Sequence, residues 1–471
     1  MSKAQLVVIG AGPGGYAAAF AAADLGMQVT LIDKEKNPGG VCLYRGCIPS
    51  KALLHIAKLL DETKEASHWG IEFGEPKIDL DKLRDFKNKV VNKLTGGLGM
   101  LSKQRKINYI QGTAKFLSSD KIEVELLEGG KDEIEFENII IATGSIISTV
   151  PSLMINSPRL LNSTTALDLP AIPKRLLVIG GGYIGLELGS VYAALGTKVS
   201  VVEMTNGLLP GADRDLVSFL ERRITPKFEK IMLSSKVAAL KEVKDGITVS
   251  MLDKDNKPFD ETYDYVLMSI GRRPTTQGLG LENTKVSLTQ RGFIETDKQC
   301  RTKDSKIFAI GDIAGDPMLA HKASHEARVA VEVIAGHKAF FEPKAIPAVV
   351  FTDPEIAWAG LTETQAKEMN IPHEVAKFPW AAASRAVTLD RNDGVTKLII
   401  EPGTERILGV AVCGPGAGEL IAEGALAIEM AATASDLKLT IHPHPTLSET
   451  VMEAAEVFFG QSVHIYRPKK G

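Results

Sequence analysis

The sequence lacks most of the features that mark a secreted, membrane-bound or nucleic-acid-binding protein. No uncharged apolar run reaches about 18 residues, so we expect no transmembrane helix. The opening stretch, MSKAQLVVIGAG, enters a strand directly, without a signal peptide or an Arg- and Ser-rich transit segment. The 55 basic and 58 acidic residues are interspersed and the net charge is −3, which indicates neither a nucleic acid nor a membrane as a partner. We therefore expect a cytoplasmic globular protein.

Cysteine is scarce, with four among the 471 residues. Because a reducing cytoplasm disfavours structural disulfides, two cysteines close together indicate metal or redox chemistry. Cys42 and Cys47 form such a pair, in the stretch GGVCLYRGCIPSKALLH at 39–55. Cys300 and Cys413 have no cysteine nearby in the sequence, and we interpret them as ordinary small side chains.

An internal repeat provides the strongest pattern. Residues 6–33 and 176–203 align without a gap at an offset of 170, and each reads as apolar strand, glycine turn, small-residue helix, strand and acid. In GxGxxG the first glycine permits the tight turn, the second lets a pyrophosphate approach, and the third brings helix against strand. The expected nucleotide-binding residues are Gly10, Gly12, Gly15 and Asp33 in the first copy, and Gly180, Gly182, Gly185 and Glu203 in the second.

One glycine motif is weak evidence, since similar turns also serve packing alone. Two full-length copies with the terminal acid predict two dinucleotide sites, in which helix N-terminal amides hold phosphates and the acid binds ribose hydroxyls. A single site accompanied by a decayed copy is the alternative.

The remaining strands predict how these units are connected. NIIIATGS and YVLMSIGRRP close one unit each, IFAIGDIAG returns to the first unit, and the stretch from IPAVVFTDPEIAWAGLT onward is an α+β pattern with an Ala-rich helix near 416–432. The predicted fold is α/β, with two Rossmann-like dinucleotide-binding domains and a C-terminal α+β domain. The expected boundaries are 1–147 and 148–269 for the two nucleotide units, 270–342 for a central segment completing the first, and 343–471 for the last.

The spacing of Cys42 and Cys47 limits how they can be joined. On one regular helix their axial separation would be about 7.5 Å, beyond the roughly 6.8 Å between Cα atoms that a disulfide spans. A bond therefore requires a distorted turn, for which Gly46 and Pro49 are suitable, and a strained bond is easily reduced. Cys47 then lies near a helix start, where the dipole lowers a thiol pKa. A redox disulfide is favoured; a metal site and two spectator thiols are the alternatives.

Five motifs together carry a resemblance: GGVCLYRGCIPSKALLH, GGGYIGLE, GRRP, IGDIAGDPMLAHKA and HPHPTLSE. With them the chain resembles the flavoprotein disulfide reductases, class I of the pyridine nucleotide-disulfide oxidoreductases, and over essentially its whole length it is similar to the dihydrolipoamide dehydrogenases. The resemblance implies FAD on the first repeat, NAD on the second and a C-terminal dimerisation domain that makes a homodimer. It further implies oxidation of lipoyl domains belonging to a dihydrolipoamide acyltransferase or a glycine cleavage carrier protein.

The resemblance also implies roles for residues at matching positions. Lys51 is expected beside the flavin, paired with Glu187, although a surface salt bridge is the simpler interpretation of such a pair. Asp312 of the GD motif is expected to hold the ribityl chain of FAD. Further expected cofactor contacts are Gly14, Gly144, Gly271, Met318, Leu319, Ala320 and His321. Two departures from the family pattern are Tyr44, where Asn is common, and His325, which has no assigned role.

His444 and Glu449 are the candidates for a general base and its orienting carboxylate. A dithiol near neutral pH is mostly protonated, so its oxidation needs a base with a pKa near 7, which histidine supplies. Spacing alone leaves a loop-capping His and a helix-dipole Glu equally acceptable. The resemblance favours the base, because HPTxxE is the family's base motif, and it implies that this His reaches the disulfide of the partner subunit. His442 is interpreted as a structural neighbour.

Three alternative functions would each require different sequence features. Glutathione reductases resemble this chain around the cysteines but have CVPKK-like residues where it has CIPSK, and mercuric reductases need a further cysteine pair that VHIYRPKKG lacks. A non-catalytic nucleotide-binding subunit or redox sensor would not need the cysteines, Lys51 and His444 together. Dihydrolipoamide oxidation is therefore the predicted function.

Overall fold

The first repeat forms the centre of a parallel sheet in the computed structural model, which describes residues 2–466. Its β1 lies between β2 and β5 and is parallel to both, while β3 extends the sheet beyond β2. Leu6, Val7 and Val8 of β1 are fully buried, as expected for a strand covered on both faces. The elements are β1 (Ser2–Ile9), α1 (Pro13–Asp24), β2 (Val29–Asp33), α4 (Leu80–Gln104), β3 (Asn108–Ser118), β4 (Lys121–Leu126) and β5 (Lys131–Ile141).

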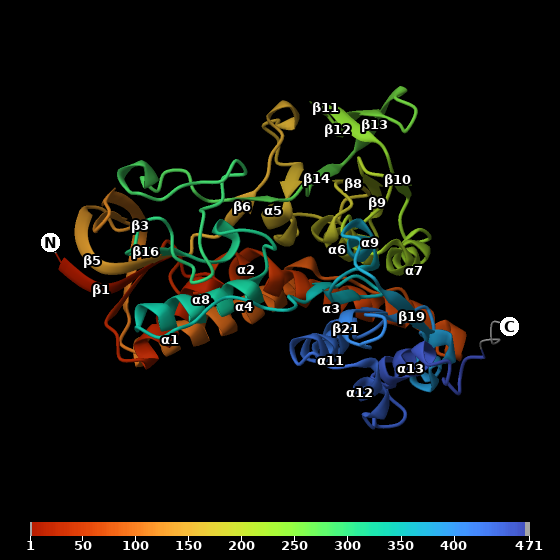
Figure 1. Ribbon diagram of the computed structural model, residues 1–471. Helices are drawn as coiled ribbons and strands as arrows, with labels where there is room; N and C mark the ends of the chain where they lie inside the picture. The colour runs from red at the N-terminus through yellow and green to blue at the C-terminus, as the bar shows by residue number, and fades with distance from the viewer. Residues whose placement is uncertain (1, 467–471) are drawn as a thin grey trace.

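The second repeat builds a separate parallel sheet in the strand order β10-β9-β8-β14-β7. A three-stranded antiparallel sheet of β11, β12 and β13 extends from it (Figure 1). The elements are β7 (Leu160–Asn162), α5 (Ser163–Leu167), β8 (Arg175–Ile179), α6 (Tyr183–Ala194), β9 (Lys198–Val202), α7 (Arg214–Ile224), β10 (Lys230–Met232), β11 (Lys236–Val243), β12 (Gly246–Leu252), β13 (Pro258–Tyr263) and β14 (Tyr265–Met268).

After the second sheet the chain returns to the first one. The strand β16 (Ile307–Ala309) pairs in parallel with β5, and α8 (Ala320–Ile334) packs on α1, where a Cβ at Gly14 would lie 3.1 Å from the Ala323 Cβ. The short strands β6 (Ser145–Ile147) and β15 (Arg272–Pro274) pair where the chain leaves and re-enters this unit. The predicted return of IFAIGDIAG is confirmed.

The C-terminal part is a five-stranded antiparallel sheet covered by helices, in the order β17-β18-β21-β20-β19. The predicted Ala-rich helix is present as α11. The elements are β17 (Ala348–Val350), β18 (Ile356–Gly360), α9 (Glu363–Glu368), β19 (Glu374–Pro379), α10 (Ser384–Thr388), β20 (Val395–Ile400), β21 (Ile407–Cys413), α11 (Ala417–Glu429), α12 (Ala434–Leu439) and α13 (Glu449–Phe458). The predicted α/β fold class with a C-terminal α+β unit is confirmed.

One helix connects all three parts. Leu53 and Ala57 of α3 (Cys47–Glu65) are buried in the same apolar cluster as Leu186 of the second sheet's unit and Val350 of the C-terminal unit. Figure 1 shows α3 running from the first unit toward the C-terminal sheet. Its first residue, Cys47, lines a cavity together with residues of the first unit and of α6. Within residues 2–466, no helix has the length and apolarity needed to span a membrane.

Candidate active site

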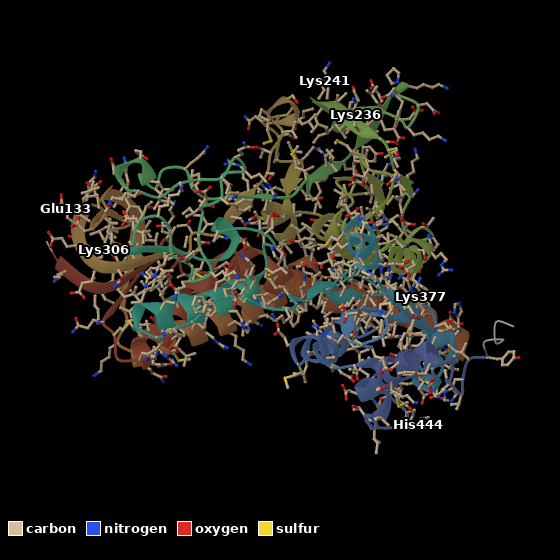
Figure 2. All side chains as sticks on the ribbon, in the orientation of Figure 1. Glu133, Lys236, Lys241, Lys306, Lys377 and His444 are labelled. Atoms are coloured by element: carbon tan, nitrogen blue, oxygen red, sulfur yellow. The ribbon has the colours of Figure 1, made fainter. Side chains whose placement is uncertain are left out.

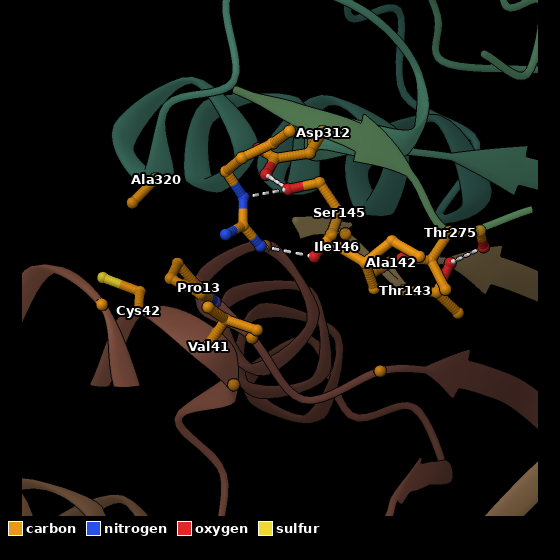
Figure 3. Close-up of a pocket in the computed structure, with 18 of the residues that line it drawn as sticks. Pro13, Val41, Cys42, Ala142, Thr143, Ser145, Ile146, Thr275, Asp312 and Ala320 are labelled. Atoms are coloured by element: carbon orange, nitrogen blue, oxygen red, sulfur yellow. Dashed lines mark hydrogen bonds between the residues drawn. The ribbon is translucent and has the colours of Figure 1, made fainter. Parts of the chain in front are cut away.

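A cavity of about 520 Å³ lies between the strand ends of the first sheet, the cysteine segment and α6. Figure 3 shows Cys42, Ser145 and Asp312 among the residues that line it. The cavity brings together residues that the sequence places up to 314 positions apart, from Ile9 to Ala323. Twelve of the predicted site residues line it: Gly10, Gly12, Gly14, Asp33, Cys42, Cys47, Lys51, Gly144, Glu187, Asp312, Met318 and Ala320.

The first glycine turn has the geometry that a phosphate site requires. Gly10 has φ +95°, and a Cβ there would lie 2.4 Å from the Ala142 carbonyl oxygen, so no larger residue fits without strain. Gly12 precedes α1, and among the described residues no side chain caps this helix start. The first amides of α1 are therefore available to an anion in the cavity.

The two terminal acids make equivalent contacts with their own glycine turns. Asp33 Oδ2 accepts a hydrogen bond from the Ala11 N–H at 2.6 Å, and Glu203 Oε2 accepts one from the Gly181 N–H at 2.7 Å. Burial raises the pKa of Asp33, although the Ala11 N–H opposes this effect. Each acid thus stabilises its own glycine turn.

The second turn repeats the first. Gly180 has φ +105°, and a Cβ at Gly185 would lie 2.4 Å from the Gly180 carbonyl oxygen, so the third glycine packs helix against strand. No described atom lies within 4 Å of a Cβ built at Gly182 or Gly271, so both border open space. Tyr183, the first residue of α6, lines the cavity, so the second turn adjoins it.

The cysteine segment contains the distorted turn that the spacing requires. The helix α2 (Gly40–Arg45) ends before Gly46, whose φ of −144° and ψ of −114° interrupt the helical path, and α3 begins at Cys47. A Cβ at Gly46 would lie 2.9 Å from the Val41 carbonyl oxygen. The structure contains both residues as free thiols in hydrogen-bonding contact. The disulfide of the oxidised protein stays a prediction.

The two thiols differ in acidity. The hydrogen bond from Cys42 is the largest influence on Cys47 and, with the nearby Lys51 charge, lowers the Cys47 pKa to about 7. The same hydrogen bond and burial raise the pKa of Cys42. Cys47 is therefore the better thiolate and leaving group of the pair. Within residues 2–466, no three or more His, Cys, Asp or Glu side chains form a group suited to a metal ion.

Lys51 and Glu187 form an ion pair across two units. Lys51 Nζ lies 2.7 Å from Glu187 Oε2, and the Glu187 side chain is 4% exposed. Lys51 follows Cys47 by about one turn of α3. The pair lies in the cavity beside the thiols, so it is not the surface salt bridge of the simpler interpretation.

His444 and Glu449 lie next to each other but do not line this cavity. His444 Nδ1 is 2.9 Å from Glu449 Oε1, and Glu449 Oε2 accepts from the Thr446 N–H at 2.7 Å. Partial burial acts to raise the pKa of Glu449, but these two contacts outweigh it and lower the pKa below its ordinary value. His444 is 66% exposed, at the edge of the C-terminal unit (Figure 2). His442 instead uses both ring nitrogens, on Glu423 and on the Thr440 carbonyl.

Three residues expected to contact FAD, Gly15, Leu319 and His321, do not line the cavity. Gly15 is covered by its own turn, since a Cβ there would lie 1.7 Å from the Gly10 carbonyl oxygen. Leu319 precedes α8 in an extended conformation, and His321 Nε2 contacts the Pro347 carbonyl at 2.7 Å. Side chains that follow one another at the start of α8 point in different directions. Met318 and Ala320 therefore face the cavity, whereas Leu319 and His321 do not. His325 is exposed on α8.

Arg272, Ser145 and Thr275 are among the polar cavity residues that were not predicted. Arg272 Nε donates to Ser145 Oγ at 2.7 Å, and Ser145 Oγ donates to Asp312, as Figure 3 shows for Ser145 and Asp312. Thr275 Oγ1 is buried and has no hydrogen-bond partner among the described residues. The GRRP motif contains Arg272 and could have indicated it; Ser145 and Thr275 carry no comparable signal.

Comparison with known proteins agrees with this geometry. Residues 4–327 match the family described as pyridine nucleotide-disulphide oxidoreductase, and residues 346–455 match the dimerisation domain of that family. The chain is 51% identical to the dihydrolipoyl dehydrogenase of Vibrio cholerae, over 97% of this chain and 96% of the relative. It is 45% identical to the dihydrolipoyl dehydrogenase of Geobacillus stearothermophilus, over 98% of each chain.

A solved structure, LpdA from Mycobacterium tuberculosis, superposes with a TM-score of 0.89 at 28% identity, covering 97% of this chain and 99% of that one. Two glycine turns of similar geometry, a cysteine pair at an interrupted helix and relatives that match nearly the whole chain all indicate the same family. The chain belongs to the pyridine nucleotide-disulphide oxidoreductase family.

Proposed function

We propose that this protein oxidises protein-bound dihydrolipoamide to lipoamide, with FAD at the first repeat and NAD⁺ as the acceptor at the second. The observation that carries the proposal is the placement of Cys42 and Cys47 beside Lys51 in one cavity with the first glycine turn. The partners would be lipoyl domains of a 2-oxoacid dehydrogenase complex or of the glycine cleavage system. Its cytoplasmic location stays a prediction.

The cavity residues suit FAD. The uncapped start of α1 would hold the pyrophosphate, and Asp33 would face the adenosine ribose. Thr275 Oγ1, buried in the cavity without a partner among the described residues, is suited to a polar group of the cofactor. Asp312, Met318 and Ala320 would contact the ribityl and ring portions. When bound, FAD and NAD supply the two-electron redox chemistry, and the protein supplies placement and charge.

Thiol–disulfide exchange explains how Cys42 and Cys47 react with the substrate. In the oxidised protein a dihydrolipoyl thiolate attacks Cys42 Sγ, so a mixed disulfide forms while the Cys42–Cys47 bond breaks and Cys47 leaves as a thiolate. The second dihydrolipoyl sulfur then attacks the first, which closes lipoamide and releases Cys42. The low pKa of Cys47 favours its departure, and His444 would accept the protons of the substrate thiols.

The proposed reaction requires a homodimer. His444 lies outside the cavity of its own chain, and residues 346–455 match a dimerisation domain, so His444 and Glu449 would serve the partner's cysteines. The predicted units at 1–147, 148–269, 270–342 and 343–471 would then supply the FAD site, the NAD site, the rest of the FAD site and the interface.

A steady-state comparison of substrates tests the function. Dihydrolipoamide with NAD⁺ is expected to give a kcat/KM exceeding those for glutathione disulfide and Hg²⁺ with NAD(P)H by a factor on the order of 10² or more, since the thiol-exchange geometry must fit the substrate. A preference for glutathione disulfide or Hg²⁺ would assign the chain to a different reductase. Lack of turnover with all three would favour a non-catalytic nucleotide-binding subunit.

NADH is expected to be preferred over NADPH by a factor on the order of 10² in kcat/KM, because the Glu203 charge repels a 2′-phosphate. Residues 204–213 contain no Lys or Arg. The guanidinium of Arg214 donates instead to backbone carbonyls of the same loop, at 2.6 Å for Leu208. Kinetics in the reverse direction with NADH and NADPH measure the ratio of the two kcat/KM values. Glu203→Gln should lower this ratio. A higher kcat/KM with NADPH would contradict the assignment.

A further inference from the structure

The Lys51 ammonium lies at a junction of three chain segments. Lys51 belongs to α3, its partner Glu187 to α6, and Phe351 directly follows β17 of the C-terminal unit. Lys51 Nζ is 2.7 Å from Glu187 Oε2 and 4.5 Å from the centroid of the Phe351 ring. A residue of the same chain's C-terminal unit thus contacts the charge that lies beside the cysteines.

The Phe351 backbone also orients the carboxylate. Glu187 Oε1 accepts from the Phe351 N–H at 3.0 Å, while Oε2 accepts from Lys51 Nζ and from Ser50 Oγ at 3.1 Å. A buried carboxylate is stable when its oxygens are satisfied by such donors. Phe351 holds one oxygen of Glu187 and α3 holds the other, so the carboxylate plane has one orientation. This orientation fixes the position of the oxygen that attracts the Lys51 ammonium.

The Phe351 ring limits where the ammonium can go. An ammonium within about 6 Å of a ring centroid is attracted to the ring face. Lys51 is 31% exposed and has a flexible four-carbon stem, so rotamers that lead its charge into solvent are open to it. Removing the ring would favour these rotamers and would weaken the action of the charge on Cys47.

We propose that Phe351 is a positioning residue for the thiol chemistry: its N–H orients Glu187, and its ring holds the Lys51 ammonium in the cavity beside Cys47. The inference rests on the proposed function and deepens it. It assigns to the C-terminal unit a role within its own chain's site, in addition to the role of His444 toward the partner.

Several titratable groups face Cys47, and Lys51 is the one that Phe351 would position. The Cys42 hydrogen bond and the Lys51 charge stabilise the thiolate, whereas the Glu187 charge opposes it. The groups from all packed elements are Cys42 of α2, Lys51 of α3, Glu187 and Tyr183 of α6, and Tyr16 of α1. Lys51 is the cation of this set, so displacing it removes positive charge and must raise the Cys47 pKa.

The test is a thiolate titration of Phe351→Leu, which removes the ring and keeps the N–H. In FAD-loaded protein with Cys42→Ser, Cys47 is the remaining thiol of the pair, and its thiolate is followed by ultraviolet absorbance against pH. The midpoint is expected to rise by about half a pH unit, which means about threefold less thiolate below the midpoint, the size of one cation–π contact. Phe351→Tyr keeps the ring and should leave the midpoint unchanged.

A Lys51→Met background separates positioning from a merely structural effect. There the Phe351→Leu change should shift the midpoint no further, because no ammonium remains to be positioned. An unchanged midpoint in Phe351→Leu, or an equal shift without Lys51, would overturn the inference. Phe351→Met replaces the Leu variant if the latter does not retain FAD. Failure of the wild type to oxidise dihydrolipoamide would instead overturn the proposed function, and the titration would remain valid.

Discussion

Replacing Cys42 by Ser is expected to lower dihydrolipoamide oxidation by a factor on the order of 10³ or more, as expected when the sulfur that forms the covalent intermediate is lost. A hydroxyl cannot form the mixed disulfide through which the substrate's electrons enter. Cys42 also shares with Cys47 the turn at Gly46, where the helix is interrupted. The measurement is the steady-state rate with dihydrolipoamide and NAD⁺.

Cys300→Ala is the matched control for a cysteine outside the site. Cys300 is buried, and burial raises its pKa to about 12, so it remains a thiol at neutral pH. This variant should retain wild-type turnover. Alkylation of oxidised, FAD-loaded wild type without reductant, followed by mass spectrometry, should leave Cys42 and Cys47 unlabelled. Labelling of both, or substantial turnover by Cys42→Ser, would contradict a redox disulfide.

His444→Gln is expected to lower the rate with dihydrolipoamide by a factor on the order of 10² or more, the usual range for a lost general base. Glu449 holds Nδ1 of the ring at 2.9 Å, which leaves Nε2 to take the thiol proton. Glutamine keeps a polar side chain of similar size but cannot accept that proton. Steady-state kinetics between pH 7 and 8 measure the effect, while FAD binding and dimer formation should be retained.

His337 offers a control with the same kind of pair. It is 61% exposed and contacts Glu332, five residues away, just as His444 contacts Glu449 five residues away. It does not line the cavity. His337→Gln should therefore leave turnover unchanged. If His444→Gln kept turnover within a few-fold of the wild type, His444 would not be the base.

The helix interruption at Gly46 was predictable from the sequence, whereas the acidity of the neighbouring thiols was predictable only in part. A distance argument on two cysteines predicted a distorted turn, and the structure contains one between α2 and α3. The acidity of the two thiols could be predicted only in part. A helix start lowers a thiol pKa, but the hydrogen bond from Cys42 and the charge of Lys51 are the specific contacts that lower the pKa of Cys47.

By itself the sequence determined both nucleotide units, because their requirements are local. Within each copy a strand, a turn at positive φ and a helix lie within about thirty residues, and α1 and α6 begin and end at equivalent positions of the repeat. The tertiary structure alone decided which side chains face the cavity. Thr275 and Phe351 join the site through residues more than a hundred positions away, and the direction of α8 turns His321 away from it. Such contacts depend on how whole units pack, which no periodicity or spacing within one segment encodes.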